Sequence, residues 1–519
     1  MFPFFLVFIL LATNFIQGLS SFVELTILPN SAPSQNRILS GTYTTPSGGS
    51  YSGAEWVNLQ TIQRPTATNA SSFFGTTTAM TSEFLFVSAP ATCGYFATSV
   101  TCSAVTTTSA GYAANNNGVG AGGNGIGYGS VFVYKQVDSQ WTQTQSLTIG
   151  SGSYELGYAI ALQGYTAVIS APRSGSIIQD NSHDVFNEPS TSVGAVYVYK
   201  YSSVSGVWSL SQTLTQSSFT VGTNTYPVQN FGASLALTPD LSTLVIGAPF
   251  KNILAGSSSV NVTGSVWIYT LGSGSYGLAG SGQGKGFLVT SSTSAWFGFK
   301  VAIGHTPITS YSGYNTIVVT SLEGTQNSLY TFSLSSAGGT WATASVFHGT
   351  GSKTFGYTLI FVNQTLVTSD YADAGNVGSA GSVYTYQWSA GSSNFAQSQK
   401  LVLGSGSLDG FGVAVTPGDN NTFAVVASTH SSNTMNGAIE GVYVYSRNSS
   451  SASFTTSYSP SSSQYYGFIQ TPAAFAFTSF VSMITSPTPQ ILVGGNDLES
   501  IYCGKLNTII NISFNISVY

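Results

Sequence analysis

The stretch that decides the fold reads FGASLALTPDLSTLVIGAP over residues 231–249, and GSVWIY follows at residues 264–269. An aromatic-glycine pair opens an alternating apolar strand, a short polar turn follows, and a second apolar strand ends at Ala-Pro. Proline ends this strand because it has no N–H to donate to a neighbouring strand. The third segment alternates with a period of two residues, as a β-strand does. The stretch therefore predicts three consecutive antiparallel strands.

The same order recurs along the chain. Its opening aromatic-glycine pairs are Phe74-Gly75, Phe231-Gly232, Phe297-Gly298, Phe355-Gly356, Phe411-Gly412 and Tyr466-Gly467, with Leu156-Gly157 as a variant. A fourth element places an aromatic residue four positions before Gln and six before an aliphatic residue, as at Trp141, Trp208 and Phe395. Four strands in each repeat are typical of a propeller blade, so the seven repeats predict an all-β, seven-bladed β-propeller of four-stranded blades. The alternative, a β-sandwich, does not explain why one order recurs seven times.

Closure of the ring is predicted from the two ends of the repeat array. The seventh repeat stops after a third strand at 500–503 and lacks the fourth element. Trp56, Gln60 and Ile62 repeat that element near the N-terminus, so we expect this strand to complete the last blade and remove an exposed sheet edge. The predicted organisation is a signal peptide at 1–20, a segment rich in Ser, Gly and Thr at 21–54, the propeller at 55–506 and a C-terminal tail at 507–519.

Several features predict a secreted glycoprotein. An apolar run at residues 2–16 precedes small residues at which a signal peptidase could cut, and no other stretch is long and apolar enough for a transmembrane anchor. Charged residues form only 6% of the chain, and the 12 Lys and Arg are scattered, which argues against nucleic acid as a partner. The candidate glycosylation sites in Asn-X-Ser/Thr sequons are Asn69, Asn261, Asn363, Asn420, Asn448, Asn511 and Asn515.

The three cysteines suit an oxidising compartment. Cys93 and Cys102 are close in sequence within a loop rich in small residues, and such a compartment would favour a disulfide between them. Cys503 is then left over. We interpret it as a buried small apolar residue rather than as half of an intermolecular bridge.

The aromatic-glycine opening and the Gly-Ala-Pro that ends the second strand resemble the FG-GAP repeat of integrin α-subunit heads, over residues 55–506. The resemblance implies a propeller that binds extracellular ligands on one face. Calcium-binding members carry several Asp residues in the loop between the first two strands, whereas these loops offer at most one carboxylate, Asp240 or Asp419. We therefore predict no metal and no cofactor, and interpret Asp419, Asn420 and Asn421 as an Asx turn rather than a weak calcium site.

A ligand-binding rim is predicted from the insertions. They follow the second strands of the early repeats, at 91–128, 173–193 and 250–263, and a long crossover spans 215–230. In an up-and-down blade these loops share one face, and loops on a rigid scaffold are where binding residues usually lie. The candidate rim residues are Tyr95, Phe96, Tyr112, Asp180, Asp184, Phe186 and Tyr226. Packing of these loops on themselves is the alternative.

One polar cluster in this rim contains residue types used in metal binding or acid-base chemistry, namely Asp180, His183, Asp184 and Glu188. No matching nucleophile or ligand pair lies elsewhere in the sequence, so we interpret the cluster as solvated loop residues. No Gly-X-Ser-X-Gly or His-Glu-X-X-His motif is present either. We therefore predict no catalytic residues and no enzymatic activity.

These features favour a secreted or cell-surface-associated module that binds an extracellular protein or glycan. One alternative is a secreted carbohydrate-active enzyme with its site at the propeller axis, which would need carboxylates converging at the inner strand ends. Another alternative is a structural coat or wall protein that presents a glycosylated and sparsely charged surface.

Overall fold

All regular structure in the described part of the chain is β-strand. The computed structural model describes residues 54–63, 65, 74–90, 129–149, 155–172, 193–249, 264–290, 296–322, 327–349, 354–371, 373, 381–392, 394–402, 411–427, 441–455, 468–470, 478–484, 490–495 and 500–508. None of these residues forms a helix long and apolar enough to cross a membrane. The strands belong to one compact unit, residues 38–519.

The sheets follow one another along the chain, and the first three contain the early repeats. The first sheet holds β2 (Thr78–Met80), β3 (Phe84–Ala89), β4 (Ser130–Val137) and β5 (Gln140–Leu147). The second holds β6 (Ile160–Gln163), β7 (Thr166–Ala171), β8 (Ala195–Ser202) and β9 (Val207–Leu214). The third holds β12 (Ser234–Leu237), β13 (Thr243–Ala248), β14 (Ser265–Gly272), β15 (Ser275–Leu278) and β16 (Phe287–Leu288). A separate hairpin of β10 (Ser218–Val221) and β11 (Asn224–Pro227) precedes this third sheet.

The later sheets contain the shorter repeats. The fourth holds β17 (Val301–Gly304), β18 (Thr316–Ser321), β19 (Ser328–Ser333) and β20 (Ala342–His348). The fifth holds β21 (Phe355–Val362), β22 (Thr365–Asp370), β23 (Ser382–Ser389) and β24 (Asn394–Leu401). The sixth holds β25 (Ala414–Asp419), β26 (Thr422–Ala427), β27 (Gly441–Ser446) and β28 (Phe468–Gln470). The last holds β29 (Thr478–Ile484), β30 (Gln490–Gly495), β31 (Ser500–Thr508) and β1 (Ala54–Gln63).

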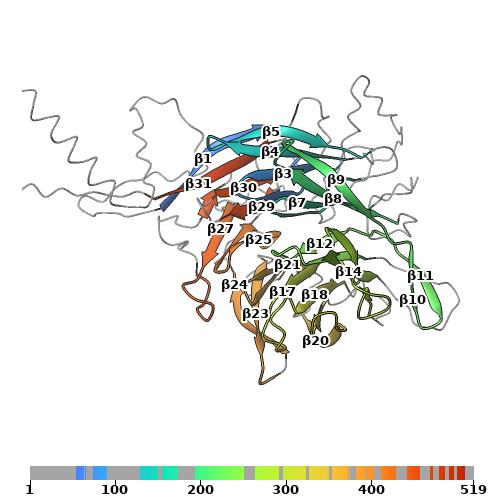
Figure 1. Ribbon diagram of the computed structural model, residues 1–519. Coiled ribbons are helices and arrows are strands. Elements are labelled where there is room, and N and C mark those ends of the chain that lie inside the picture. The colour runs from blue at the N-terminus through green and yellow to red at the C-terminus, as the bar shows by residue number, and fades with distance from the viewer. Residues whose placement is uncertain are drawn as a thin grey trace, which may run out of the picture. The chain divides into compact units, whose positions relative to one another are not determined.

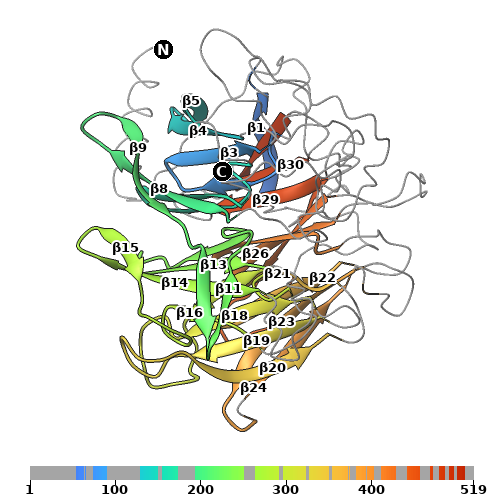
Figure 2. The same ribbon diagram turned by 90° about the vertical axis from the view of Figure 1, so that its right-hand side faces the viewer.

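The sheets are arranged as a propeller, which confirms the predicted all-β propeller fold. Their first strands contact one another in the order β2, β6, β12, β17, β21, β25 and β29, and β29 contacts β2 again. Neighbouring sheets pack face to face, and Figure 2 shows β20 of the fourth sheet next to β24 of the fifth. Six sheets have the predicted four strands. The third departs from the prediction, because β16 pairs with β14 as an additional strand.

The N-terminal strand closes the ring as the sequence predicts. β1 pairs antiparallel with β31, with Trp56 opposite Leu506 and Ile62 opposite Ile501. Figure 1 shows the two strands side by side, although they come from opposite ends of the chain. The last sheet is therefore completed by residues more than four hundred positions away in the sequence.

The predicted start of the last blade at Tyr466-Gly467 is wrong. The strand that follows this pair, β28, pairs with β27 and fills the fourth position of the sixth sheet, with Phe468 opposite Tyr443. The last sheet begins at Thr478 instead, with β29. The outer edge of β27 has N–H and C=O groups that need partners, and the backbone of segment 468–470 supplies them.

The burial of each strand explains its composition. The second strands β3 and β7 are buried at every residue, because neighbouring sheets cover both of their faces. The outer strands β5 and β9 bury only their aromatic and terminal Leu residues and expose most polar positions between them. The apolar second strand therefore lies inside the sheet, and the polar, alternating fourth strand forms its outer edge.

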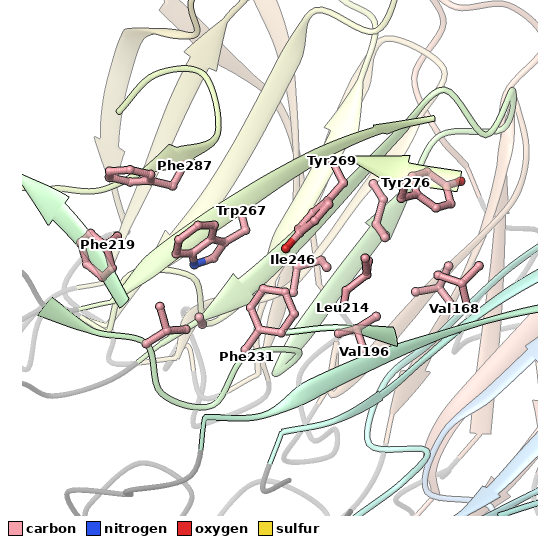
Figure 3. Close-up of a cluster of buried hydrophobic side chains, with 14 of the residues drawn as sticks. Val168, Val196, Leu214, Phe219, Phe231, Ile246, Trp267, Tyr269, Tyr276 and Phe287 are labelled. Carbon is pink, nitrogen blue, oxygen red and sulfur yellow. The ribbon is translucent and has the colours of Figure 1, made fainter. Parts of the chain in front are cut away.

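The aromatic-glycine pair connects neighbouring sheets. Phe231 is fully buried, and Figure 3 shows it beside Trp267 and Tyr269 in a hydrophobic cluster between the second and third sheets. The glycine of the pair packs on the preceding sheet. Gly157 has a φ of +95°, and a Cβ added there would lie 2.7 Å from the Cβ of Ser88. Glycine is needed for both its backbone conformation and its lack of a side chain.

The aromatic-Gln element also connects neighbouring sheets. Each Gln side chain donates to the backbone carbonyl of the next sheet's aromatic residue and accepts from the backbone N–H of the same residue. For Gln60 and Trp141 these two distances are 2.9 and 2.7 Å, and for Gln145 and Trp208 they are 2.8 and 2.9 Å. The same pair of bonds joins Gln212 to Tyr276 and Gln399 to Phe454. The Gln60 pair joins the last sheet to the first.

Candidate functional site

The first strands of all the sheets surround a cavity of about 340 Å³. Its walls come mostly from the residues that directly follow the glycine of each aromatic-glycine pair, and they are 76–78, 158–160, 233–235, 299–301, 357–360, 413–415 and Val481. The repeat thus brings one short segment from each sheet to the propeller axis. Cavities at such positions are common places for ligands, because a rigid frame holds side chains that are free to vary.

Lys300 is the one charged side chain among the described residues that line the cavity. It is partly exposed, and its Nζ lies 5.4 Å from the centroid of the neighbouring Phe299 ring. Burial among the strand ends lowers the pKa of the Lys300 ammonium below its ordinary value of 10.5. An ammonium in such a place is energetically unfavourable without an anionic partner.

No carboxylate within the described ranges forms an ion pair with Lys300. By contrast, Lys135 lies 3.2 Å from a carboxylate oxygen of Glu83, and Lys400 lies 2.7 Å from one of Asp373. Burial opposes protonation of Lys400, but the hydrogen bonds and electrostatic attraction of Asp373 and Tyr384 together outweigh this effect, and the pKa of Lys400 is raised. The two lysines thus have a stabilised positive charge, whereas that of Lys300 is destabilised.

Three hydroxyl groups of the lining residues already donate their protons to other groups of the protein. The Oγ1 of Thr77 donates to the carbonyl of Tyr158 at 2.9 Å, and the Oγ of Ser234 donates to the carbonyl of Gly298 at 2.9 Å. The Oγ1 of Thr358 likewise donates to the Oγ of Ser369 at 2.7 Å. A hydroxyl oxygen that has donated its proton still has lone pairs with which to accept. The cavity therefore offers acceptor oxygens and one ammonium.

Two tyrosines, together with Thr76 and Thr78, complete the polar part of the described lining. Tyr357 packs against Phe299 and Tyr371, with ring centroids 6.1 and 4.6 Å apart. Burial raises the pKa of Tyr357 well above its usual range, so its phenol stays neutral. Tyr158 lines the cavity from the second sheet. The sixth and last sheets contribute only apolar residues to the described lining, at 413–415 and Val481.

Lys300 was not among the predicted site residues, although the sequence contains a signal for it. Two residues after the motif glycine, the other repeats in which a first strand follows that glycine have small residues, namely Thr77, Ala159, Ser234, Thr358 and Ala414. Only the fourth repeat has a long, charged residue there. A comparison of the repeats position by position would have identified Lys300 as the exception.

Most of the predicted site residues lie outside the described residues. These are the rim residues Tyr95, Phe96, Tyr112, Asp180, Asp184 and Phe186, the cysteines Cys93 and Cys102, and the sequon residues Asn69, Asn261, Asn511 and Asn515. The other sequon residues, Asn363, Asn420 and Asn448, are exposed. The N–H of Asn421 donates to Asp419 Oδ1 at 2.8 Å, which is the hydrogen bond of the predicted Asx turn.

Tyr226 is misplaced in the predicted rim. It lies in β11, is only 1% exposed and stacks on Phe219 with ring centroids 5.5 Å apart. The crossover that contains it folds as the hairpin β10–β11, which turns both aromatic rings into the hydrophobic cluster of Figure 3. Tyr226 therefore stabilises the fold and offers no surface to a ligand.

Comparison with known proteins finds similar solved structures but no matching family. No protein family matches the sequence, and neither does any curated protein. The Dos1 propeller has 9% identity and a TM-score of 0.37, over 74% of each chain. The periplasmic gluconolactonase PpgL of Pseudomonas aeruginosa has 14% identity and a TM-score of 0.37, over 70% of this chain and 87% of that one. A putative 6-phosphogluconolactonase of Bacteroides fragilis has 13% identity and a TM-score of 0.35, over 73% and 90%.

These matches correct one prediction. We predicted no enzymatic activity, and the similar structures include one described as a gluconolactonase and one described as a putative 6-phosphogluconolactonase. The prediction that the chain is not an enzyme is therefore withdrawn. Likeness at 13% and 14% identity does not assign either activity to this chain.

Proposed function

We propose that the chain is a secreted, seven-bladed propeller of the FG-GAP kind that binds a small ligand in its axial cavity. The five-stranded third sheet counts as one blade of this ring. The observation that carries the proposal is Lys300, a partly exposed ammonium in the cavity with no ion-pair partner among the described residues. A ligand that carries negative charge would supply that partner.

The fold itself does not require a lysine at this position. The equivalent residues of the other repeats are Thr, Ala or Ser, and their sheets have the same arrangement of first and second strands. An unpaired charge near the axis destabilises the ring, whereas a small residue would not. Residues that break a local rule without a structural benefit are expected at functional sites. Lys300 fits that description.

A thermal-shift screen of the full secreted chain tests the proposal. The panel holds neutral sugars, sugar acids, amino acids and inorganic anions. We expect at least one anionic compound to raise the melting temperature of the wild type, because a ligand that binds only the native state stabilises it. The shift should disappear in Lys300→Met and persist in Lys285→Met, which removes an exposed lysine outside the cavity. A panel without any shift, or a shift that Lys300→Met retains, would contradict the proposal.

Catalysis in the same cavity is a second candidate, which the lowered pKa of Lys300 favours. A lowered pKa increases the fraction of unprotonated amine at any given pH, and the free amine can act as a general base or a nucleophile. NMR spectra of the bound compound, recorded over a day with wild type and Lys300→Met, test this. New resonances only with the wild type support catalysis, and unchanged spectra with both contradict it.

A further inference from the structure

Resting on the proposed function, the geometry points to a hydroxy acid as the ligand, with its carboxylate on Lys300 Nζ and its hydroxyls donating to oxygens of the cavity wall. Each part of this assignment follows from a separate property of the lining. These properties are the single cation, the hydroxyl groups that have already donated their protons, the apolar segment of the lining and the volume of the cavity.

The single cation sets the charge of the ligand. Lys300 can neutralise one negative charge, and no second cation lies among the described lining residues. A carboxylate has one charge, whereas a phosphate monoester has up to two and would leave one of them without a partner. A neutral ligand would leave Lys300 unpaired, and a cationic one would be repelled by it. The charge therefore favours a monoanion.

The hydroxyl groups set the polar groups of the ligand. Thr77 and Thr358, which are both partly exposed, have already donated their protons within the protein, at 2.9 and 2.7 Å. What they can still do is accept, so the best partners are hydroxyl donors on the ligand. A simple fatty acid has none and would leave these acceptors without hydrogen bonds. A carboxylate that also carries hydroxyls satisfies both Lys300 and the wall.

The apolar segment and the volume set the size. Residues 413–415 and Val481 form one part of the lining without a polar side chain, against which C–H groups of a ligand can pack. The volume of about 340 Å³ is near the lower end of the range of about 300–1,000 Å³ for ligand pockets. A molecule of the size of one sugar-acid ring fits this volume, whereas a long oligosaccharide does not.

Three ring compounds of similar size separate the contribution of the carboxylate to binding from that of the hydroxyl groups. Glucuronate has both the carboxylate and the hydroxyls, glucose has only the hydroxyls, and cyclohexanecarboxylate has only the charge. Isothermal titration of the full chain should show glucuronate binding about 10- to 100-fold more tightly than either of the others, as expected for loss of a charge-assisted or of several neutral hydrogen bonds. Lys300→Met should remove the preference for glucuronate over glucose, and Lys300→Arg should keep part of it.

A cavity-filling variant separates this inference from the proposed function. Ala414→Phe puts a ring into the lining without changing a charge, so it should abolish binding of every compound that uses the cavity. If glucose binds as tightly as glucuronate and Ala414→Phe abolishes both, the cavity is the site and the hydroxy-acid assignment is wrong. If glucuronate binds equally to wild type and Ala414→Phe, with both proteins folded by circular dichroism, the axial site itself is wrong. If none of the three compounds binds the wild type, the hydroxy-acid assignment is overturned, and the thermal-shift screen decides the proposed function.

Discussion

Replacing Gln60 by alanine should weaken the closure of the ring. The Gln60 side chain makes two hydrogen bonds to the backbone of Trp141, at 2.9 and 2.7 Å, and so joins the last sheet to the first. An intramolecular hydrogen bond contributes about 0.5–1.5 kcal/mol net, so the loss of two predicts a decrease of about 1–3 kcal/mol in the free energy of unfolding. Trp141 is only 4% exposed, so water replaces these bonds poorly and the upper part of this range is expected.

The assay is equilibrium unfolding in urea, followed by tryptophan fluorescence and circular dichroism. Gln143→Ala is the matched control, because Gln143 is exposed in the same strand as Trp141 and its loss should change the free energy by less than about 0.5 kcal/mol. Gln145→Ala breaks the equivalent pair between the first and second sheets and should cost about the same as Gln60→Ala. Equal stability of Gln60→Ala and Gln143→Ala would refute the role assigned to the aromatic-Gln element.

Three further changes test other parts of the account. Lys300→Met should raise the free energy of unfolding at pH 7 by about 0.5–2 kcal/mol, as removal of an unfavourable charge does. Because the folded-state pKa of Lys300 is below its unfolded value of 10.5, the unfolded chain binds more protons between the two values, and this group makes wild-type stability rise with pH there. Tyr357 has a raised pKa and acts in the opposite direction above pH 10, so the measured quantity is the difference between wild type and Lys300→Met across pH 7–10. Gly157→Ala should destabilise by at least about 2 kcal/mol in urea unfolding, because it combines a positive φ with a clash against Ser88. Arg447→Met should cost about 2–3 kcal/mol in the same assay, because the buried guanidinium donates hydrogen bonds to Thr365 and to the carbonyl of Val362 that join the fifth and sixth sheets.

The strands were predictable where the sequence repeats the same residue types at the same spacing. Phe231-Gly232 and the Ala-Pro at 248–249 mark positions at which one sheet touches the next, so they recur whenever the packing recurs. Closure was predictable for the same reason, because Trp56 and Gln60 repeat an element that makes specific bonds to a neighbouring sheet. The prediction that the last blade starts at Tyr466-Gly467 was wrong because an aromatic-glycine dipeptide alone does not determine which strand follows it. The strand after it fills an open edge in the preceding sheet.

The candidate site was not predictable from motifs. Lys300 belongs to no signature, and its importance arises only when the first strands meet around one cavity and leave it without a carboxylate. The prediction that Tyr226 lies on the surface was wrong for a related reason. The crossover that contains Tyr226 folds back as a hairpin, and the hydrophobic effect buries its aromatic ring. Its position in a long crossover had predicted that the ring would be exposed.

The pKa of Lys300, measured in the intact protein, shows whether the axial cavity holds an unpaired ammonium that a ligand can neutralise. Lysines labelled with ¹³C by reductive methylation give one resonance each, and Lys300→Met identifies the one from the cavity. We predict a pKa of Lys300 below the ordinary value of 10.5 in the free protein and a rise of this pKa when glucuronate is added, with the resonances of Lys135 and Lys400 unchanged by the ligand. A pKa of Lys300 at its ordinary value that no anionic compound of the screening panel alters would contradict the claim that the axial cavity is a ligand site.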